Sequence, residues 1–379
     1  MDSTPSEAAP ADGSRRTNRL VVGVMTGTSL DGIDAALVAI GGTGLAMSAR
    51  AVRHWSAPLG SLAADLRRLA AGEAMPVGGV GRLAVDFGRH LARVLAEGLG
   101  DDRPDFVAIH GQTVHHAPPV SVQLVEPAPI VQELQCPVVA QLRQADLAAG
   151  GEGAPITPLA DWVLLRHADR RRAVVNLGGF CNITWLPAGN DAANIDAISG
   201  ADVCACNQTL DAAARRGLGT PIDIDGRRAR SGIVVKDAVR ELEAVLQAQR
   251  AGKRSLGSGD EPTAWVDKFT PLLRGEDLVR SAVEGTANVI ATTLNETLVE
   301  EVIVAGGGAR HPVLLECIEA SSRAATTTSD AHGVAIEARE AIAMAVLGAL
   351  CADGVPITLP AVTGARAGVA GAWHGLPGI

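Results

Sequence analysis

The chain has 379 residues, of which 47% are hydrophobic and 20% are charged, and its formal net charge is −9 at pH 7. This length and apolar content predict two globular domains, each with a core of its own. The negative charge argues against nucleic-acid binding, and five Trp, four Phe and no Tyr leave little material for stacking on bases. No apolar run reaches about 18 residues, so no membrane span is expected.

The N-terminus and the cysteines indicate a cytoplasmic protein. Residues 1–17 are rich in Ser, Ala, Pro and Asp, which predicts a disordered leader. The apolar run after Arg15 and Arg16 is too short for a twin-arginine signal. Without an export signal, the six cysteines are expected to be reduced. Cys204 and Cys206 are spaced too closely for the usual zinc or redox pair, although a redox switch formed by these two thiols stays open.

The first ordered segment is a glycine-rich hairpin. Apolar runs at 20–24 and 33–40 flank a Gly/Thr/Ser turn, which predicts two antiparallel strands with free backbone donors at the tip. Such a tip can hold a phosphate because glycine N–H groups approach an anion closely, and three glycines are available: Gly23, Gly27 and Gly32. Asp31 and Asp34 could hold a metal ion through water. The pattern matches neither a P-loop nor a dinucleotide fingerprint, so an ordinary hairpin remains an alternative.

A strand around 46–54 and helices over 62–69 and 80–99 follow, as apolar spacing predicts. A short buried strand over 106–109 then ends at His110, Gln112 and Thr113. Polar groups at the carboxyl end of a strand are well placed to line a site. His115 and His116 lie nearby, but no ligand spacing for a metal is completed, so contact with a sugar or phosphate is favoured over a metal site.

The middle of the chain contains a predicted hinge between two lobes. A strand over 138–142 leads into Arg143 and Asp146, and the Gly-rich stretch at 147–155 precedes a helix over 158–166. This arrangement predicts a first lobe over 18–155 and a second over 156–379, with a plain connector as the alternative to a hinge.

The second lobe opens with another glycine-tipped hairpin. Apolar residues at 173–175 enter a turn containing Gly178 and Gly179, and residues 180–185 leave it. Two such hairpins, one at the start of each half, imply lobes of similar topology that hold a polyphosphate between them.

Helices predominate in the rest of the chain. They are predicted over 208–217, 283–299, 312–320 and 337–350, with a charged helical insertion near 226–280. A strand over 301–305 ends in Gly306, Gly307 and Gly308. Because glycines expose bare backbone, this turn suits a flat ligand such as an adenosine.

Taken together, these motifs resemble the anhydro-N-acetylmuramic acid kinase family of the actin, Hsp70 and sugar-kinase superfamily. The resemblance extends over about residues 20–370 and follows the family's order of motifs: 23–34, 110–114, 150–155, 176–184, 306–312 and 360–365. It implies an α/β, two-lobed actin-like ATPase (ribonuclease H-like) fold with mixed sheets flanked by helices and the active site in the interlobe cleft. It also implies ATP and Mg2+, a small-molecule sugar substrate, no nucleic-acid or membrane partner, and favours a homodimer.

The implied reaction opens the 1,6-anhydro ring of anhydro-N-acetylmuramate with water while ATP phosphorylates O6, in the recycling of cell-wall sugar. Two other readings stay open: a kinase of a different anhydro-sugar or sugar-like acceptor, and a nucleotide-binding homologue without catalysis. They stay open because the substrate-side loops depart from the family pattern. Of the family's Asp-Thr-Gly-Pro-Gly-Asn loop only Asp202 and Asn207 remain, and residues 141–146 lose one carboxylate and two guanidinium groups.

The resemblance assigns roles to individual residues, while metal ligands stay unassigned. Asp202 matches the general base that deprotonates the attacking water, with a turn or capping aspartate as the alternative. Arg143 could pair with an acidic group such as the lactyl carboxylate, or form an ordinary surface ion pair. The residues implied to bind ATP are Gly27, Thr28, Ser29, Leu30, Asp31, Gly32, Ile33, Asp34, Gly178, Gly179, Gly306, Gly307 and Gly308. Those implied to bind the substrate are His110, Gln112, Thr113, Arg143, Asp146 and Asn207.

Overall fold

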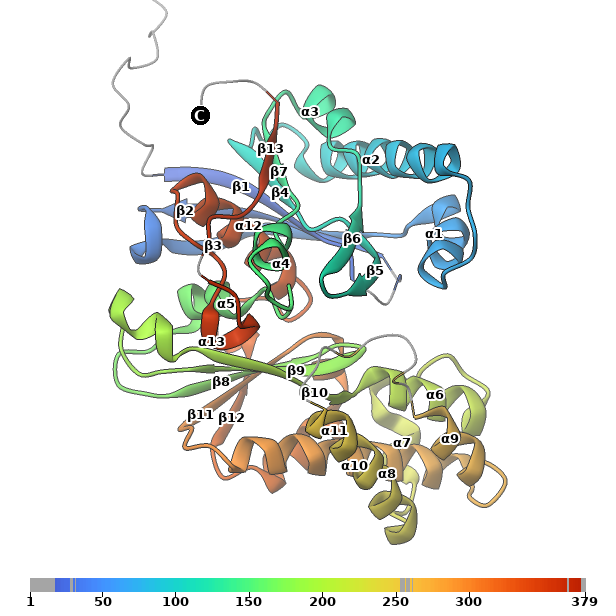
Figure 1. The fold of residues 1–379 in the computed structure, drawn as a ribbon. Helices are drawn as coiled ribbons and strands as arrows, with labels where there is room; N and C mark the ends of the chain where they lie inside the picture. Colours follow the sequence, from blue (N-terminus) through green and yellow to red (C-terminus); the bar gives the residue numbers. More distant parts are fainter. Residues whose placement is uncertain are drawn as a thin grey trace, which may run out of the picture.

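The computed structural model describes residues 18–375, except 28, 29, 31, 253–255, 257–259, 261 and 367. It has two α/β lobes, drawn one above the other in Figure 1, so the expected fold class is confirmed. One lobe is built on a six-stranded sheet of order β13-β7-β4-β1-β2-β3 and the other on a five-stranded sheet of order β10-β9-β8-β11-β12. A separate hairpin, β5-β6, extends from the first lobe toward the second.

The strands and helices have the following bounds. The first sheet contains β1 (Asn18–Met25), β2 (Ile33–Gly41), β3 (Ser48–Ala57), β4 (Phe106–Ile109), β7 (Val138–Ala140) and β13 (Ala372–His374), and the separate hairpin contains β5 (Gln112–Ala117) and β6 (Val120–Leu124). The second sheet contains β8 (Arg172–Leu177), β9 (Phe180–Leu186), β10 (Ser199–Ala205), β11 (Glu301–Ala305) and β12 (Ala325–Thr328). The helices are α1 (Ala63–Ala70), α2 (Val77–Leu99), α3 (Ala128–Leu134), α4 (Gln144–Ala148), α5 (Pro158–Leu165), α6 (Asn207–Leu218), α7 (Arg227–Ser231), α8 (Lys236–Ala251), α9 (Thr263–Phe269), α10 (Gly275–Asn295), α11 (Pro312–Ser321), α12 (Arg339–Ala352) and α13 (Pro360–Thr363).

Both predicted hairpins form. β1 and β2 pair antiparallel along their length, from Asn18 opposite Gly41 to Met25 opposite Asp34. β8 and β9 pair in the same way, and each hairpin is extended by a parallel neighbour, β4 for the first and β11 for the second. The central strands β1, β4, β8 and β11 are buried on both sides because helices cover both faces of each sheet there, whereas the edge strand β3 is largely exposed.

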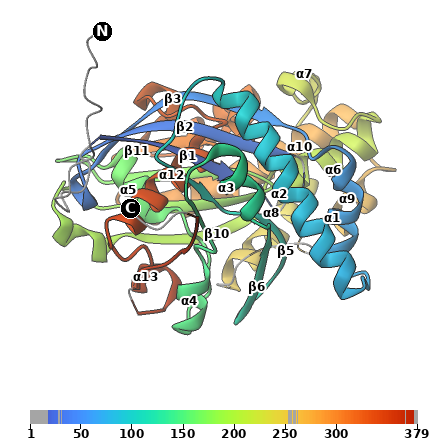
Figure 2. The ribbon, with the colours of Figure 1, turned by 90° about the horizontal axis from the view of Figure 1, so that it is seen from above.

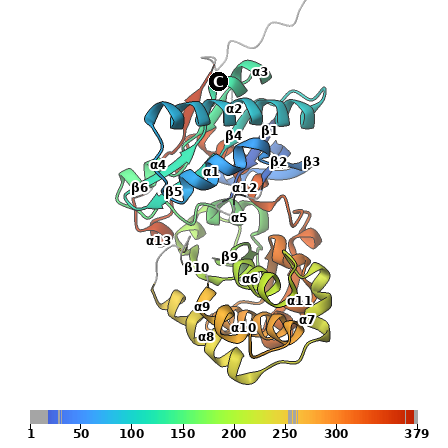
Figure 3. The same cartoon turned by 90° about the vertical axis from the view of Figure 1, so that its right-hand side faces the viewer.

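Two helices join the lobes. Val21 of β1 and Val174 of β8 belong to one continuous core that also contains the buried faces of α5 and α12. Figure 3 shows these two helices between the sheets. The outer faces have separate cores, with α2 lying across the first sheet (Figure 2) and α6, α8 and α10 packed on the second. No helix in the described ranges is long and apolar enough to cross a membrane.

Gly23 lies in the middle of β1 against α12. A Cβ atom at this position would lie 1.9 Å from the carbonyl oxygen of Ala341 and 2.5 Å from the nitrogen of Ala345. Both neighbours are backbone atoms, so they could not move aside without shifting the helix. The expectation that Gly23 approaches an anion is therefore wrong, and close packing of helix on strand accounts for this glycine.

The end of the chain returns to the first lobe. α12 packs against β1 and β2, and β13 pairs antiparallel with β7 at the edge of the six-stranded sheet. All of 156–379 was expected in the second lobe, and the structure differs because the apolar face of α12 covers the sheet around Gly23. The segment between α12 and β13 therefore crosses the junction of the lobes.

Candidate active site

The glycine turns that follow β8 and β11 pack against each other. Gly306 has φ of +83°, and a Cβ atom there would lie 2.7 Å from Oδ1 of Asn176 and 2.9 Å from the carbonyl oxygen of Leu177. At Gly308 a Cβ atom would lie 2.8 Å from Oδ1 of Asn207. Neither position has room for a side chain. The structure thus brings the second hairpin turn (178–179) and the third glycine turn (306–308) together.

Asn207, expected at the substrate, begins α6 beside these turns. Its Nδ2 donates to the carbonyl oxygen of Leu177 at 3.1 Å, and its backbone N–H donates to that of Gly178 at 3.0 Å. The next N–H, of Gln208, donates to Gly179 at 3.1 Å. Asn207 is therefore grouped with the residues expected to bind ATP.

The tip of the first hairpin is held from the first lobe. Of its predicted ATP-binding residues, Thr28, Ser29 and Asp31 lie outside the described residues. The buried side chain of Gln112 donates through Nε2 to the carbonyl oxygen of Gly27 at 2.8 Å. Leu30 adopts φ of +54°, and its carbonyl oxygen accepts a bond of 3.0 Å from Arg67. Gln112, expected at the substrate, thus supports the hairpin tip.

The residues next to the tip of the first hairpin differ in how far they are buried. Ile33 is fully buried, whereas Gly32 and Asp34 line an open hollow with Ser56. The hydroxyl of Ser56 donates to Oδ1 of Asp34 at 2.6 Å. Thr113 is nearly buried on β5, and its carbonyl oxygen accepts a long bond of 3.4 Å from Gln112.

Glu340, in the first turn of α12, links the two hairpins. Its Oε1 accepts a bond of 3.4 Å from Nδ2 of Asn176, at the end of β8. Burial raises the pKa of Glu340, and the carboxylate of Asp34, at the start of β2, raises it further. Glu340 was not among the residues expected at the site. The available signal was an adjacent Arg and Glu at the start of an otherwise apolar helix, Arg339–Ala352.

Arg143 and His110 form a pair on the first lobe. Nε of Arg143 donates to Nε2 of His110 at 2.8 Å, and Nη1 donates to the carbonyl oxygen of Gly153. Nδ1 of His110 then carries the proton and donates to the carbonyl oxygen of Gly111 at 2.9 Å. Burial, followed by the charge of Arg143, lowers the pKa of His110 to about 3, so this imidazole is neutral at neutral pH.

Asp202 approaches Arg143 from the second lobe. It lies on β10 where the register shifts against β9, and its Oδ2 accepts a bond of 2.8 Å from the N–H of Leu256. Burial raises the pKa of Asp202, while the bond from Leu256 and the charge of Arg143 lower it. Burial also lowers the pKa of Arg143 to about 10, and Glu340, Asp202 and Asp146 act in the opposite direction. The structure therefore brings Arg143, His110 and Asp202 into one electrostatic group.

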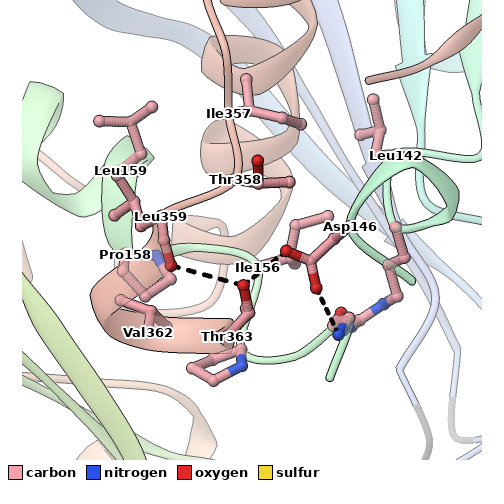
Figure 4. A pocket seen from close by; sticks show the side chains of 13 residues that line it. Leu142, Asp146, Ile156, Pro158, Leu159, Ile357, Thr358, Leu359, Val362 and Thr363 are labelled. Carbon is pink, nitrogen blue, oxygen red and sulfur yellow. Dashed lines mark hydrogen bonds between the residues drawn. The ribbon is translucent and has the colours of Figure 1, made fainter. Parts of the chain in front are cut away.

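Asp146, the remaining predicted substrate residue, is buried behind this group. One carboxylate oxygen accepts the N–H of Gly153 at 2.7 Å, and the other accepts the hydroxyl of Thr363. Figure 4 shows both bonds at the edge of a small, mainly apolar pocket. With both oxygens engaged, Asp146 contributes to the geometry of the chain around Arg143.

The residues that replace the family's glycine loop lie in the core of the second lobe. Val203, Cys204, Ala205 and Cys206 are each 0% exposed. This segment was expected to be a loop, but residues 203–205 form the end of β10 and Cys206 immediately precedes α6, because their apolar side chains pack against the helices of that lobe. The departures from the family pattern thus alter the core, while Asp202 keeps an exposed side.

We expect the thiols of Cys181, Cys204 and Cys206 to resist alkylation in the native protein. Burial raises the pKa of Cys206 to about 12 and those of the other two well above their usual value, and the thiolate is the reactive form. Peptide mass spectrometry after iodoacetamide treatment at about pH 8 should find these three unmodified, and modified once the protein is denatured. The partly exposed Cys317 serves as the internal comparison. Fast native labelling of Cys204 or Cys206 with loss of ATP binding would instead favour a redox switch.

Comparisons with known proteins agree on one family. The family model described as anhydro-N-acetylmuramic acid kinase matches residues 19–373. A protein of that name from Salinibacter ruber is 35% identical over 391 residues, covering 93% of this chain and 95% of the relative. One from Bordetella pertussis is 35% identical over 364 residues, covering 92% and 94%.

Similarity to solved structures is more distant. A ROK family glucokinase from Streptomyces griseus, in complex with glucose and AMPPNP, has a TM-score of 0.40 and 14% identity, covering 86% of this chain and 98% of that one.

Proposed function

The chain belongs to the anhydro-N-acetylmuramic acid kinase family, as its motifs predicted, and we propose that it phosphorylates O6 of 1,6-anhydro-N-acetylmuramic acid with ATP while water opens the anhydro ring. Family membership makes it a phosphotransferase with an alcohol group as acceptor. The product of the proposed reaction is N-acetylmuramate 6-phosphate, and its role is the recycling of cell-wall sugar in the cytoplasm. A homodimer is part of the same proposal.

The observation that carries the proposal is the approach of Arg143 and Asp202 from opposite lobes. The charge of Arg143 favours the ionised form of Asp202, and the charge of Asp202 favours the protonated form of Arg143. Burial of both side chains disfavours their charged forms. A carboxylate with a raised pKa suits a general base, because proton transfer is most efficient when the pKa of the base lies near the working pH. An arginine next to it suits an acidic acceptor such as the muramate, whose lactyl group carries a carboxylate.

The proposed chemistry has one proton transfer and two bond exchanges. Asp202 takes a proton from water as the water oxygen bonds to C1 of the sugar. The bond from C1 to O6 breaks, and the electron pair goes to O6. O6 then bonds to the γ-phosphorus, ADP leaves, and the proton on Asp202 is released to solvent. Arg143, with Nε and Nη1 engaged, has Nη2 available for the acceptor, since no bond to it occurs among the described residues.

The glycine turns suit the phosphates and the nucleoside. Backbone N–H groups in tight glycine turns attract anions, and the 306–308 turn exposes backbone next to Asn176 and Asn207. Asn207, beside these turns, is assigned to the nucleotide side. His110 remains neutral and orients Arg143.

Mg2+ fits the carboxylates at the hairpin junction. Asp34 and Glu340 are close enough for like charge to raise the pKa of Glu340, and a cation would relieve this repulsion. Within the described part of the chain no group of three or more potential ligands is arranged around a metal site. In phosphoryl-transfer sites Mg2+ keeps several waters and takes one or two carboxylates plus phosphate oxygens, and Asp34 and Glu340 supply two carboxylates. When bound, the ion neutralises charge on the transferring phosphoryl group.

The proposal is tested by measuring ADP release from ATP with 1,6-anhydro-N-acetylmuramic acid, with levoglucosan and without acceptor. We expect ADP release with the muramate and only background in the other two reactions. Activity with levoglucosan and none with the muramate would indicate a kinase of another anhydro-sugar. ATP binding without acceptor-dependent ADP release would indicate a nucleotide-binding homologue.

A further inference from the structure

The last helix, α13, holds the Gly-rich segment 150–155 in place. The hydroxyl of Thr363 donates to Oδ1 of Asp146, and Oδ2 of Asp146 accepts the N–H of Gly153 at 2.7 Å. The carbonyl oxygen of Thr363 accepts the N–H of Glu152 at 3.0 Å. Figure 4 shows Thr363 and Asp146 facing each other across the edge of the pocket. We call these contacts of Thr363 and Asp146 with the segment the α13 clamp.

The clamp is connected to the arginine of the site. The carbonyl oxygen of Gly153 accepts Nη1 of Arg143, and Nε of the same guanidinium donates to His110 at 2.8 Å. A chain of hydrogen bonds therefore runs from Thr363 through Asp146 and Gly153 to Arg143. Since Gly153 supplies one of the two anchors of the guanidinium, its position helps set the direction of the free Nη2.

The segment has little room to move. A Cβ atom on Gly151 would lie 2.4 Å from Oδ2 of Asp146 and 2.6 Å from Cβ of Ala365. Gly153 has φ of +68°, and a Cβ atom there would lie 2.9 Å from the side chain of Leu147. Asp146 is 3% exposed and Thr363 is 8% exposed, so water cannot readily replace the bond between them.

The same segment touches the strand that carries the proposed base. The Cβ position of Gly200, two residues before Asp202 on β10, lies 3.4 Å from Cγ of Pro155. α13 also packs against β10. The α13 clamp thus lies where the arginine of one lobe and the aspartate of the other are brought together.

We propose that Thr363 and Asp146 are positioning residues for acceptor binding: by fixing Gly153 they fix the guanidinium of Arg143 opposite Asp202. The inference rests on the proposed function and deepens it, because it assigns the end of the chain a role in recognising the acidic group of the acceptor. Neither residue touches the acceptor, and each acts through Arg143.

The first test compares three variants in the full-length protein. Thr363→Val removes the hydroxyl with little change of shape, and we expect the KM for the acceptor to rise about tenfold while the KM for ATP and kcat change less than about twofold. Thr363→Ser keeps the hydroxyl and should restore the wild-type KM. Thr358→Val is the matched control, because Thr358 lies before α13, lines the same pocket and bonds to Arg366 and Gly368 but not to Asp146.

The second test asks whether Thr363 acts through Arg143. In an Arg143→Lys background the bond to Gly153 is already altered, so Thr363→Val should raise the acceptor KM by less than about twofold further. An equal tenfold rise in both backgrounds would overturn the proposal. So would a Thr358→Val variant with the same defect as Thr363→Val.

A readout without catalysis separates this inference from the proposed function. Hydrogen exchange of the Gly153 amide, followed by NMR, should be faster in Thr363→Val than in wild type and unchanged in Thr363→Ser and Thr358→Val. Faster exchange in a protein that shows no acceptor-dependent ADP release would contradict the proposed function but would still support the α13 clamp as a structural feature. If exchange of the Gly153 amide is unchanged in Thr363→Val, the α13 clamp is contradicted, whether or not the protein is active.

Discussion

Replacing Asp202 by asparagine is expected to lower kcat by about 10³-fold, because a positioned general base typically contributes 10²–10⁴-fold and asparagine cannot accept the proton. Binding of ATP should be unchanged, since the glycine turns do not involve this carboxylate. Burial raises the pKa of Asp202, so its ionised form is disfavoured in the folded protein. The neutral asparagine should therefore leave the thermal midpoint unchanged or slightly higher. Steady-state kinetics, calorimetric titration of ATP and thermal unfolding measure the three quantities.

The pH dependence of kcat/KM tests the role of Asp202 as general base independently. A base must be ionised to act, so kcat/KM of the wild type should fall as the pH is lowered through the pKa of Asp202. This acid limb should lie above the value of an ordinary aspartate, because burial raises that pKa. Asp211→Asn, on the neighbouring helix α6, is the control and should keep wild-type kcat within about twofold. Full turnover in Asp202→Asn would show that another group is the base.

Replacing Arg339 by methionine is expected to destabilise the fold by about 3–5 kcal/mol, because it leaves a buried carboxylate without its counter-charge. Arg339 is 1% exposed and Asp161 is 0% exposed. Nε of Arg339 donates to Oδ1 of Asp161 at 3.0 Å, and Nη2 donates to Oδ2 of Asp161 and, at 3.2 Å, to the hydroxyl of Thr157. Thr184 of β9 also donates to Asp161, at 3.1 Å. The pair thus joins α5, α12 and the second sheet, and urea unfolding measures its loss.

Two comparisons isolate the cause of this destabilisation. Adding Asp161→Leu to Arg339→Met should recover most of the loss, because the uncompensated charge is removed with its partner. Arg310→Met removes an exposed ion pair with Glu337 and should cost no more than about 1 kcal/mol. If Arg339→Met proves as mild as Arg310→Met, the buried pair does not hold the lobes together.

The same variant should respond to pH in a defined direction. Burial already raises the pKa of Asp161, and Arg339 opposes this shift. Without Arg339 the folded-state pKa rises further above the unfolded value, so folding takes up a proton between the two. The deficit in stability of Arg339→Met should therefore shrink as the pH is lowered through the folded-state pKa.

Apolar runs and their spacing were sufficient to predict the elements whose own residues carry that pattern. The expected elements include the two hairpins, β4, α2 and α11. Each of them has a run or a regular spacing of apolar residues within its own sequence, so it could be predicted from that sequence alone. β10 was not predicted, because the buried Val-Cys-Ala run at its end has no alternation and follows polar residues. β13 was not predicted either, since three residues become a strand only by pairing with β7.

The residues of the candidate site also divide into those that a local motif identifies and those that depend on distant contacts. The glycine turns, Arg143, His110 and Asp202 were identifiable from motifs, and the structure adds their contacts. Glu340 was missed and Gly23 misinterpreted because both depend on α12 packing against a strand more than 300 residues earlier. Likewise, the bonds that occupy Asp146 come from Gly153 and from Thr363, 217 residues later in the chain. Contacts over such distances leave no local trace in the sequence.

The central claim is that the two lobes hold ATP while Asp202 activates water against the anhydro sugar. It is tested most directly by mass spectrometry of the product formed with ATP in ordinary water and in H2(18)O. The expected product is about 98 Da heavier than the muramate, from water plus phosphate, and about 2 Da heavier again in labelled water, with the label at C1. A product heavier by phosphate alone, about 80 Da and without label, would contradict the account.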